Sequence, residues 1–236
     1  MECLWLRIRA PFAAFRGFQA GVYRATAPVM PPSAAFGLVL NLAGVEMRDG
    51  LDRPTTLIRA DVPCLKLAIG IVPGLKSEVC TLYQQLHSYP VGASGKELAA
   101  RTHGAKYWIV PVRREFLVGL DMVLGVQADQ ELLQKVRQGL RGELNALRYG
   151  LPFAGDNNFL FDRIDILDEV PPTLWYIKMQ PDDPPMRKSY RLTVGIDRAD
   201  NSKTTSYLYA PLDELTSEPP ETAWTWTPKQ PEVAVG

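Results

Sequence analysis

Apolar and polar residues alternate at the start of the chain, and this pattern predicts a β-strand over residues 3–9. Its alternating apolar positions are Leu4, Leu6 and Ile8. Because Pro11 cannot donate a backbone hydrogen bond, the strand is expected to end there and to continue as an irregular loop. A second apolar run predicts a helix over residues 33–42, with Ser33 as its N-cap behind two prolines and Gly44 as its stop signal.

Apolar runs further along the chain predict more strands and one more helix. Residues 55–71 are rich in β-branched and apolar side chains and are interrupted at Pro63. Runs at 107–111 and 115–126 predict a hairpin, and leucines spaced three and four apart predict an amphipathic helix over 130–147. The remaining strand-like runs are 159–167, 173–178, 190–196 and 206–215.

Three segments lack a regular period. Residues 72–106 are polar and contain several glycines, which is typical of an inserted arm or a long loop. Residues 148–158 combine glycines with an arginine and side-chain amides, and they predict a second irregular loop. The tail from Ser217 contains proline, glutamate and two tryptophans, so it is expected to be poorly ordered or docked only by its tryptophans.

The order strand, helix, strands, helix, strand predicts an α+β fold. In such a fold two helices pack on one face of an antiparallel sheet, as in the ferredoxin-like βαββαβ unit. A chain of 236 residues with 46% hydrophobic content can bury a substantial core, either as one large domain or as one domain with an inserted arm.

Charge is balanced over the whole chain and uneven along it. The 26 basic and 26 acidic residues give a net charge of zero, which neither requires nor excludes a polyanionic partner. Basic residues outnumber acidic ones over residues 1–60, whereas acidic residues concentrate after residue 155. The N-terminal part is therefore the basic one.

The cysteines and the absence of long apolar runs indicate the cellular compartment in which we expect the protein. Cys3, Cys64 and Cys80 are odd in number and lack the short paired spacing of zinc or redox motifs, so buried free thiols are expected and no metal site is. No run reaches the about 18 apolar residues of a membrane span, and no signal peptide is evident. We therefore expect a cytoplasmic protein without a membrane partner.

The sequence lacks the motifs of several classes of enzyme. Neither GxxxxGK[ST] nor GxGxxG occurs, and both histidines, His87 and His103, lie in the irregular arm, away from any nucleophile elbow. Metal-independent RNA cleavage stays open, because it needs a general base, a cation and often a tyrosine. His103, Lys106 and Tyr107 would supply these groups, although Lys106 and Tyr107 more simply begin a strand.

The loop after the first strand has the chemistry of a nucleic-acid contact. It mixes arginines, which bind phosphate, with aromatic rings, on which bases stack. These residues are Arg9, Arg16, Arg24, Phe12, Phe15, Phe18 and Tyr23. An ordinary strand, loop and helix of the core is the simpler interpretation of this segment alone. In the same way, residues 148–158 suit a phosphate or a base edge, or else a plain helix cap and turn.

Four stretches, in this order, resemble the CRISPR-associated protein family five of the RAMP superfamily. They are APFAAFRGFQAGVYRATAPVMPPSAAFGLVLNLAGVE, GLKSEVCTLYQQL, HGAKYWIVPVRREFLVGLDMVLG and RYGLPFAGDNNFLFDRI. The resemblance covers about residues 1–170, and the order of the stretches is more specific than any one of them.

This resemblance implies an RRM-related, ferredoxin-like domain over residues 1–170 with a thumb-like arm at 72–112. It also implies a strand-rich region at 171–216, followed by the tail at 217–236. In that family the subunit binds the 5′ handle of the CRISPR RNA (crRNA) in a type I Cascade effector. The partners implied are that handle, a backbone RAMP subunit, the large subunit and, indirectly, target DNA near the PAM, with no cofactor.

The resemblance places the RNA contacts in four groups by position. The first loop contributes Arg9, Phe15, Arg16 and Arg24, and the first helix contributes Ser33 and Phe36 at its start and Asn41 one turn further on. The arm contributes Lys76, Lys106 and Tyr107, and the later loop contributes Arg148, Tyr149, Asn157 and Asn158.

One branch of the family is an endonuclease that uses a tyrosine and an adjacent lysine and histidine. No Lys-His pair occurs here, since Lys106 is followed by Tyr107. This departure favours a non-catalytic subunit, as in type I-B-like systems, over a ribonuclease that processes precursor crRNA. A generic protein-interaction domain is the third alternative. The zero net charge further predicts weak RNA binding by the lone protein and tight binding after assembly.

Overall fold

The computed structural model describes residues 2–17, 22–50, 57–74, 78–90 and 107–231, and we refer to these as the described residues. They form an α+β fold whose central unit is βαββαβ, as predicted. In chain order its elements are β1 (Glu2–Ala13), α1 (Pro32–Leu42), β5 (Leu65–Ile71), β7 (Tyr107–Ala128), α2 (Gln130–Arg141) and β8 (Arg163–Leu167). The strands lie in the order β5-β7-β1-β8, all antiparallel to their neighbours, which is the ferredoxin-like order.

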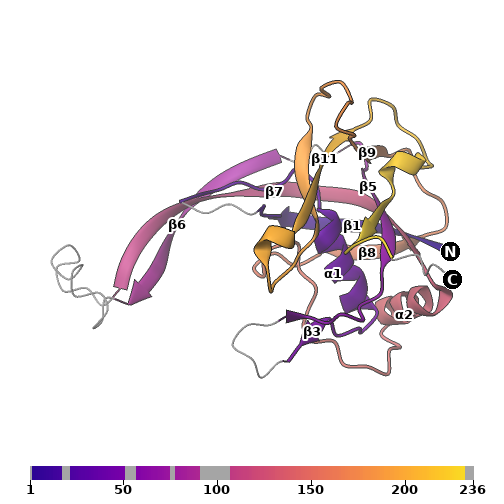
Figure 1. Cartoon of the computed structure of the whole chain (residues 1–236), viewed down its shortest axis with the longest axis horizontal. Coiled ribbons are helices and arrows are strands. Elements are labelled where there is room, and N and C mark those ends of the chain that lie inside the picture. Colours follow the sequence, from indigo (N-terminus) through magenta and orange to yellow (C-terminus); the bar gives the residue numbers. More distant parts are fainter. Residues whose placement is uncertain (1, 18–21, 51–56, 75–77, 91–106, 232–236) are drawn as a thin grey trace.

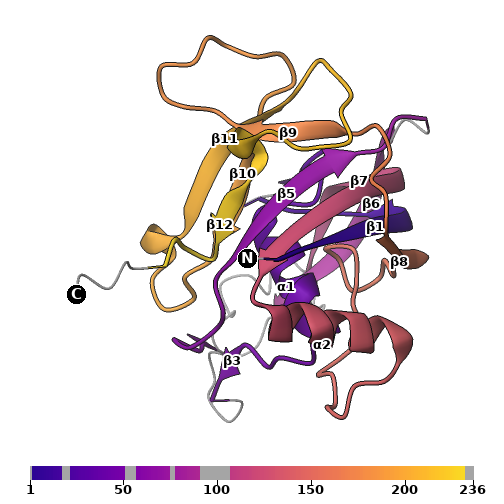
Figure 2. The ribbon, with the colours of Figure 1, turned by 90° about the vertical axis from the view of Figure 1, so that its right-hand side faces the viewer.

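Both helices pack on the same face of the sheet, as Figure 2 shows. The alternation along β1 explains this arrangement, because successive side chains of a strand point to opposite faces. Leu4, Leu6 and Ile8 are buried in one cluster with the apolar residues of α1 and α2. On the other face, Trp5 packs against Trp175 with ring centroids 5.9 Å apart.

The first strand is longer than predicted. It continues through Pro11 to Ala13, and Phe12 and Ala13 still pair with β7. The pairing with β8 ends at Arg9, so beyond that residue β1 has a neighbour on one side only. A proline is tolerated on such an edge, because its missing N–H has no ladder partner to lose.

The helix ends differ from the sequence prediction in two places. Pro31 is the N-cap of α1 and no side chain caps the helix, so Ser33 lies in the first turn. Gly44, with φ +66°, follows the helix end as predicted. Helix α2 ends at Arg141, because Gly142 adopts a left-handed C-cap; the predicted extension to residue 147 is wrong.

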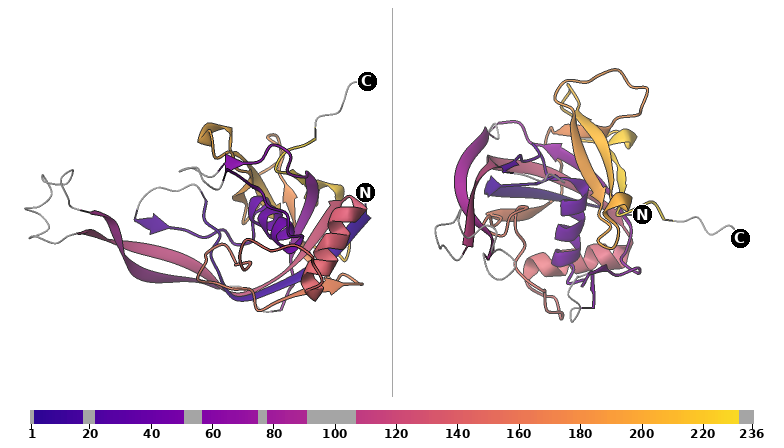
Figure 3. Two further views of the ribbon diagram at one scale, coloured as in Figure 1. Left: turned by 90° about the horizontal axis from the view of Figure 1, so that it is seen from below. Right: turned by 60° about the vertical axis from the view of Figure 1, so that its left-hand side comes forward.

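A long hairpin extends from the body of the molecule, and Figures 1 and 3 show it projecting to one side. It consists of β6 (Glu78–Pro90) and the first half of β7. Residues 78–90 are therefore a strand and not an irregular arm. Strand β7 is also continuous where a break was predicted, because Val112 is buried while Arg113 is exposed, so the alternation of a strand is kept through the arginines.

Shorter strands complete the sheet. β9 (Leu174–Lys178), β11 (Thr205–Pro211) and β10 (Tyr190–Gly195) extend it beyond β5 in that order. β12 (Thr225–Thr227), in the tail, also pairs with β5, so the tail joins the sheet by backbone pairing as well as by its tryptophans. Away from this sheet, β3 (Arg48–Asp49) pairs with β4 (Leu57–Ile58). No helix in the described part of the chain is long and apolar enough to cross a bilayer.

Candidate functional site

The first loop and the glycine-rich loop, far apart in sequence, lie against each other. The backbone N–H of Ala14 donates to the carbonyl of Ala154 at 2.9 Å. Gly155 has φ +80°, and a Cβ atom at this position would lie 2.2 Å from the carbonyl oxygen of Ala14. Only glycine permits this approach, which fixes the relative position of the two loops.

A buried carboxylate, that of Asp156, joins three segments at this contact. It accepts hydrogen bonds from the guanidinium of Arg16 in the first loop and from that of Arg114 in β7, the latter at 2.7 Å. It also accepts from the backbone N–H and the side-chain amide of Asn158, at 3.1 and 2.8 Å. The Asp156 side chain is only 7% exposed, so both ion pairs are shielded from water on the carboxylate side.

Four arginines lie on the segments that meet where the hairpin leaves the body, and we call Arg16, Arg24, Arg113 and Arg114 the arginine cluster. β2 (Tyr23–Arg24) pairs in parallel with β7, which sets Arg24 opposite Arg114 and Tyr23 opposite Arg113. Since neighbouring side chains of a strand point to opposite faces, Arg24 and Arg114 lie on one face and Arg113 lies on the other. Among the described residues, Arg24 and Arg113 have no carboxylate partner. The cluster therefore carries positive charge that the fold does not neutralise.

Aromatic side chains accompany the arginine cluster. The Arg113 guanidinium donates to the hydroxyl of Tyr83 at 3.0 Å and lies 5.4 Å from the centre of its ring. Tyr83 is 72% exposed. Tyr23 donates to Glu115, and this hydrogen bond raises the pKa of the Tyr23 hydroxyl above its usual range. The exposed ring of Phe12 packs against Phe116 with centroids 5.7 Å apart.

A cavity of about 350 Å³, which we call the α1 pocket, lies between helix α1 and the glycine-rich loop. Its lining is mostly apolar, with a few polar groups. The lining residues predicted as RNA contacts are Ser33, Phe36, Asn41 and Tyr149. Gly155 also lines it, so the loop residue next to Asp156 connects the α1 pocket to the arginine cluster.

Asn41, in the wall of the α1 pocket, has a buried side-chain oxygen without a partner in the described part of the chain. Its amide Nδ2 donates to the carbonyl of Gly150 at 3.1 Å, which fixes the orientation of the side chain. Its Oδ1 is buried and has no hydrogen-bond partner among the described residues. An unpaired buried acceptor is costly, and this oxygen has almost no surface open to the α1 pocket, so a ligand reaches it only if the side chain moves.

Three of the predicted RNA contacts make contacts within the protein. Arg9 lies on the sheet face opposite the helices, where it donates to Asp165 at 2.9 Å. Phe15 is 2% exposed and belongs to the core, which does not fit a direct contact with RNA. Arg148 donates to the carbonyl of Gly139 in the last turn of α2 and does not line the α1 pocket.

The remaining predicted contacts fall into two groups. Asn157 is exposed on the glycine-rich loop beside Asn158. Tyr149 is 45% exposed and lies under the Arg48 guanidinium, which is 4.5 Å from its ring centre. Lys76, Lys106 and His103 lie outside the described residues, as does the side chain of Tyr107, whose backbone begins β7.

The sequence prediction missed Arg113, Arg114 and Tyr83. A usable signal existed, because two adjacent arginines interrupt an apolar run at residues 112–118. In the described part of the chain, no group of three His, Cys, Asp or Glu side chains is placed to bind a metal ion.

One family model and two solved structures are similar to this chain. A family model described as "CRISPR-associated protein (Cas_Cas5)" matches residues 3–144, and no curated protein matches the chain. A solved structure titled "CRISPR RNA-guided surveillance complex" contains a chain with a TM-score of 0.55 and 14% identity, covering 91% of this chain and 90% of that one. Another, titled "Crystal structure of Cas protein", has a TM-score of 0.43 and 12% identity, over 91% and 94%.

Proposed function

Because this chain belongs to the CRISPR-associated protein family Cas5, we propose that it is a non-catalytic subunit of a type I Cascade effector. Its task in that complex is to bind and cap the 5′ handle of the crRNA. The observation that carries this proposal is the junction of a basic surface and a pocket through one loop. Asp156 holds Arg16 and Arg114 of the arginine cluster on one side of the loop, and Gly155 lines the α1 pocket on the other.

The two parts of the junction suit the two parts of a nucleotide. Guanidinium groups bind phosphate oxygens in a fixed fork geometry, and Arg24 and Arg113 have no carboxylate partner among the described residues. A mostly apolar cavity with a few polar groups suits a base that has left its stack. A handle RNA that enters both parts is held through its phosphates at the arginine cluster and is recognised through one of its bases in the α1 pocket.

Neighbouring Cas subunits complete the proposed binding site. The net charge of zero fits a subunit that buries much of its surface against protein partners, since isolated RNA-binding domains are more often basic. We assign the backbone RAMP subunit and the large subunit as these partners, and contact with target DNA near the PAM as indirect. The lone protein is then expected to bind RNA weakly.

Removal of the unpaired charges tests this proposal. We expect the double variant Arg24→Ala, Arg113→Ala to weaken binding of a labelled repeat-derived handle RNA by about tenfold or more in the assembled complex. The slope of the logarithm of affinity against the logarithm of salt concentration should also become shallower by about 0.7 for each phosphate that is no longer neutralised. The matched control is Arg59→Ala, because Arg59 is exposed, distant in sequence and paired with Asp61.

Three outcomes would contradict the proposal. The first is an unchanged affinity and salt dependence in the double variant. The second is tight, handle-specific binding by the lone protein, which would show that RNA binding does not require assembly with other subunits. The third is cleavage of repeat RNA that disappears in His103→Ala, which would establish the ribonuclease alternative.

A further inference from the structure

Two neighbouring cavities meet at Gly17, in the first loop. The smaller one, of about 60 Å³, is lined by Arg16, Gly17, Arg24 and Ala25, and we call it the arginine hollow. The larger one, of about 520 Å³, lies beside β10 and β11, and we call it the β10–β11 cavity. Because Gly17 lines both, the surface of the arginine cluster continues into the β10–β11 cavity.

The lining of the β10–β11 cavity is polar. It contains one arginine, one amide and a set of hydroxyl groups, carried by Arg191, Asn201, Ser189, Thr193, Thr204 and Ser206. No leucine, isoleucine, valine or tryptophan among the described residues lines it. This composition differs from that of the mostly apolar α1 pocket, and it suits a sugar–phosphate chain better than a base.

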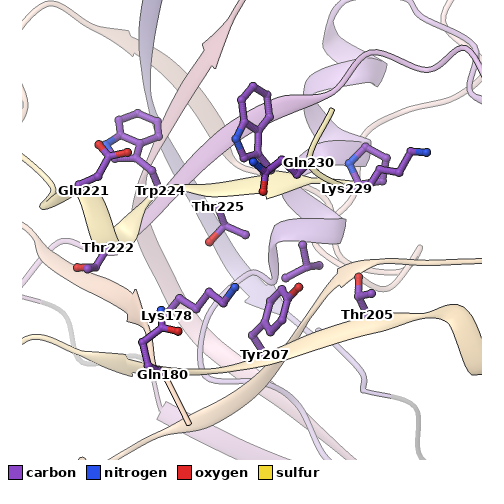
Figure 4. A pocket seen from close by; sticks show the side chains of 13 residues that line it. Lys178, Gln180, Thr205, Tyr207, Glu221, Thr222, Trp224, Thr225, Lys229 and Gln230 are labelled. Atoms are coloured by element: carbon purple, nitrogen blue, oxygen red, sulfur yellow. The ribbon is translucent and has the colours of Figure 1, made fainter. Parts of the chain in front are cut away.

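The register of β10 and β11 places these polar side chains on one face of the sheet. Thr193 in β10 pairs with Ser206 in β11, and paired residues of neighbouring strands point to the same face. Arg191 lies two positions before Thr193, so it shares that face. Thr205 and Tyr207 point to the opposite face, where they line a separate cavity (Figure 4).

Arg191 brings an uncompensated positive charge to this polar face. Its Nη1 donates to the carbonyl of Ser206 at 3.4 Å, which directs the guanidinium over β11. No carboxylate in the described part of the chain pairs with it. The carboxylates of the next loop, those of Asp197 and Asp200, accept from amides of their own loop and do not line the cavity. The remaining guanidinium donors are therefore available to a phosphate.

Hydroxyl groups beside Arg191 are also available to a ligand. The Oγ1 of Thr204 accepts from the backbone N–H of Asp197 at 3.1 Å, a bond that does not use its own O–H. The hydroxyls of Thr193 and Ser206 have no hydrogen-bond partner among the described residues. A ribose 2′-hydroxyl is both a donor and an acceptor, so it matches such groups, whereas deoxyribose has no group to offer them.

Hydrogen bonds of the protein itself hold β10 beside the first loop. The hydroxyl of Tyr190 donates to the carbonyl of Thr26 at 3.4 Å. Thr26 in turn accepts from the backbone N–H of Phe15 at 3.0 Å through its hydroxyl, and its own N–H donates to Glu115 at 3.1 Å. The position of the β10–β11 cavity relative to the arginine cluster is therefore set by the fold.

We propose that the β10–β11 cavity binds the sugar–phosphate chain of the RNA next to the part held by the arginine cluster. A phosphate binds Arg191, and a ribose 2′-hydroxyl binds Thr193 and Ser206. This inference rests on the proposed function, because the RNA reaches the cavity through the arginine hollow. It adds a contact that distinguishes RNA from DNA by the sugar, independently of the base sequence.

The experiment titrates the full chain, at low salt, into labelled single-stranded RNA and DNA of the same repeat-derived sequence and follows fluorescence anisotropy. Arg191→Ala should weaken the binding of both probes about tenfold, because the phosphate contact is common to them. The double variant Thr193→Val, Ser206→Ala should weaken RNA binding about fivefold and leave DNA binding unchanged, because only ribose carries the 2′-hydroxyl.

A second measurement leaves the protein unmodified. RNA probes with a single deoxyribose, moved along the sequence, should show one position at which RNA binding weakens about as much as in the hydroxyl double variant. At that position the double variant should bind the substituted and the unsubstituted RNA equally.

Matched controls remove the same chemical groups elsewhere. Arg137→Ala takes a guanidinium from α2 that lines neither cavity, and it should leave both affinities unchanged. The double variant Ser217→Ala, Thr222→Val removes two exposed hydroxyls outside both cavities and should also have no effect. Equal thermal unfolding of all variants and the unmodified protein would show that the fold is retained.

The outcomes separate this inference from the proposed function. If Arg191→Ala binds both probes normally while Arg24→Ala, Arg113→Ala binds them weakly, the inference is overturned and the proposed function stands. The reverse result would support the β10–β11 cavity and contradict the proposed handle contacts. Equal loss of RNA and DNA binding in the hydroxyl double variant would overturn the ribose contact, and so would the absence of binding by either probe.

Discussion

At the scale of single residues, side chains that the sequence suggested as ligand contacts divide into those that contact the protein interior and those that stay available at its surface. Phe15 and Arg148 are of the first kind, because one is buried in the core and the other is bonded to the end of α2. Arg24 has no described carboxylate partner, and Tyr149 lines the α1 pocket. Asp156, which no motif singled out, joins the two loops to β7 by binding Arg16 and Arg114.

We expect Asp156→Asn to lower the free energy of unfolding by about 2 kcal/mol, because two guanidinium groups lose a shared buried carboxylate. Urea denaturation followed by circular dichroism measures this change. Asp162→Asn is the matched control, since Asp162 is exposed on the same segment, and its effect should stay within about 0.5 kcal/mol. Equal stability of the two variants would show that Asp156 does not hold the loops together.

At the scale of elements, glycines decide how closely the helices and loops approach. Gly139 lies inside α2, and a Cβ atom there would be 1.8 Å from the carbonyl oxygen of Leu42 in α1. Gly37 lies inside α1, and a Cβ atom there would meet nothing within 4 Å. Two glycines in equivalent helical settings therefore have different roles, which helix propensity cannot distinguish.

Alanine substitution at these two glycines should change stability in opposite directions. Gly139→Ala forces the helices apart and should lower the free energy of unfolding by about 1–3 kcal/mol. Gly37→Ala makes no clash and lowers the backbone entropy of the unfolded chain. It should therefore raise the free energy of unfolding by about 0.5–1 kcal/mol. Urea denaturation of both variants checks this, and a shift in the same direction would contradict the close contact between α1 and α2.

At the scale of the whole molecule, two buried tyrosines join the central sheet to its C-terminal extension. Burial raises the pKa of Tyr176 to about 12, and burial, opposed in part by the Thr225 hydrogen bond, raises that of Tyr209 to about 12. Both hydroxyls are thus held in the protonated form by the fold. Their contribution to stability is complete below pH 10, the usual tyrosine pKa, and is lost as the pH rises towards 12.

Alkaline titration tests this coupling. We expect a late phase of tyrosinate absorbance above pH 11 that coincides with loss of the circular dichroism signal. In Tyr176→Phe one titrating hydroxyl is absent, so the midpoint of alkaline unfolding should move to higher pH. If all tyrosines ionise near their usual pKa while the fold stays intact, the two hydroxyls are not buried as described.

The hydrophobic pattern alone was enough for the α+β class and the ferredoxin-like order, because the periods of strands and helices are local properties. The prediction from this pattern was wrong where pairing with a distant segment decides whether a residue lies in a strand. Pro11 stays in a strand because β8 ends before it, and residues 78–90 form a strand because β7 pairs with them. The three residues of β12 are too few to carry a period of their own.

The sequence by itself determined which segments are regular, which faces are buried and which family the chain resembles. Only the tertiary structure decided which of the candidate residues meet. Arg16 and Asp156 are 140 residues apart in the chain, and Asn41 and Gly150 are 109 apart. Such contacts depend on strand order and close backbone packing at Gly155, which no local pattern of residues encodes.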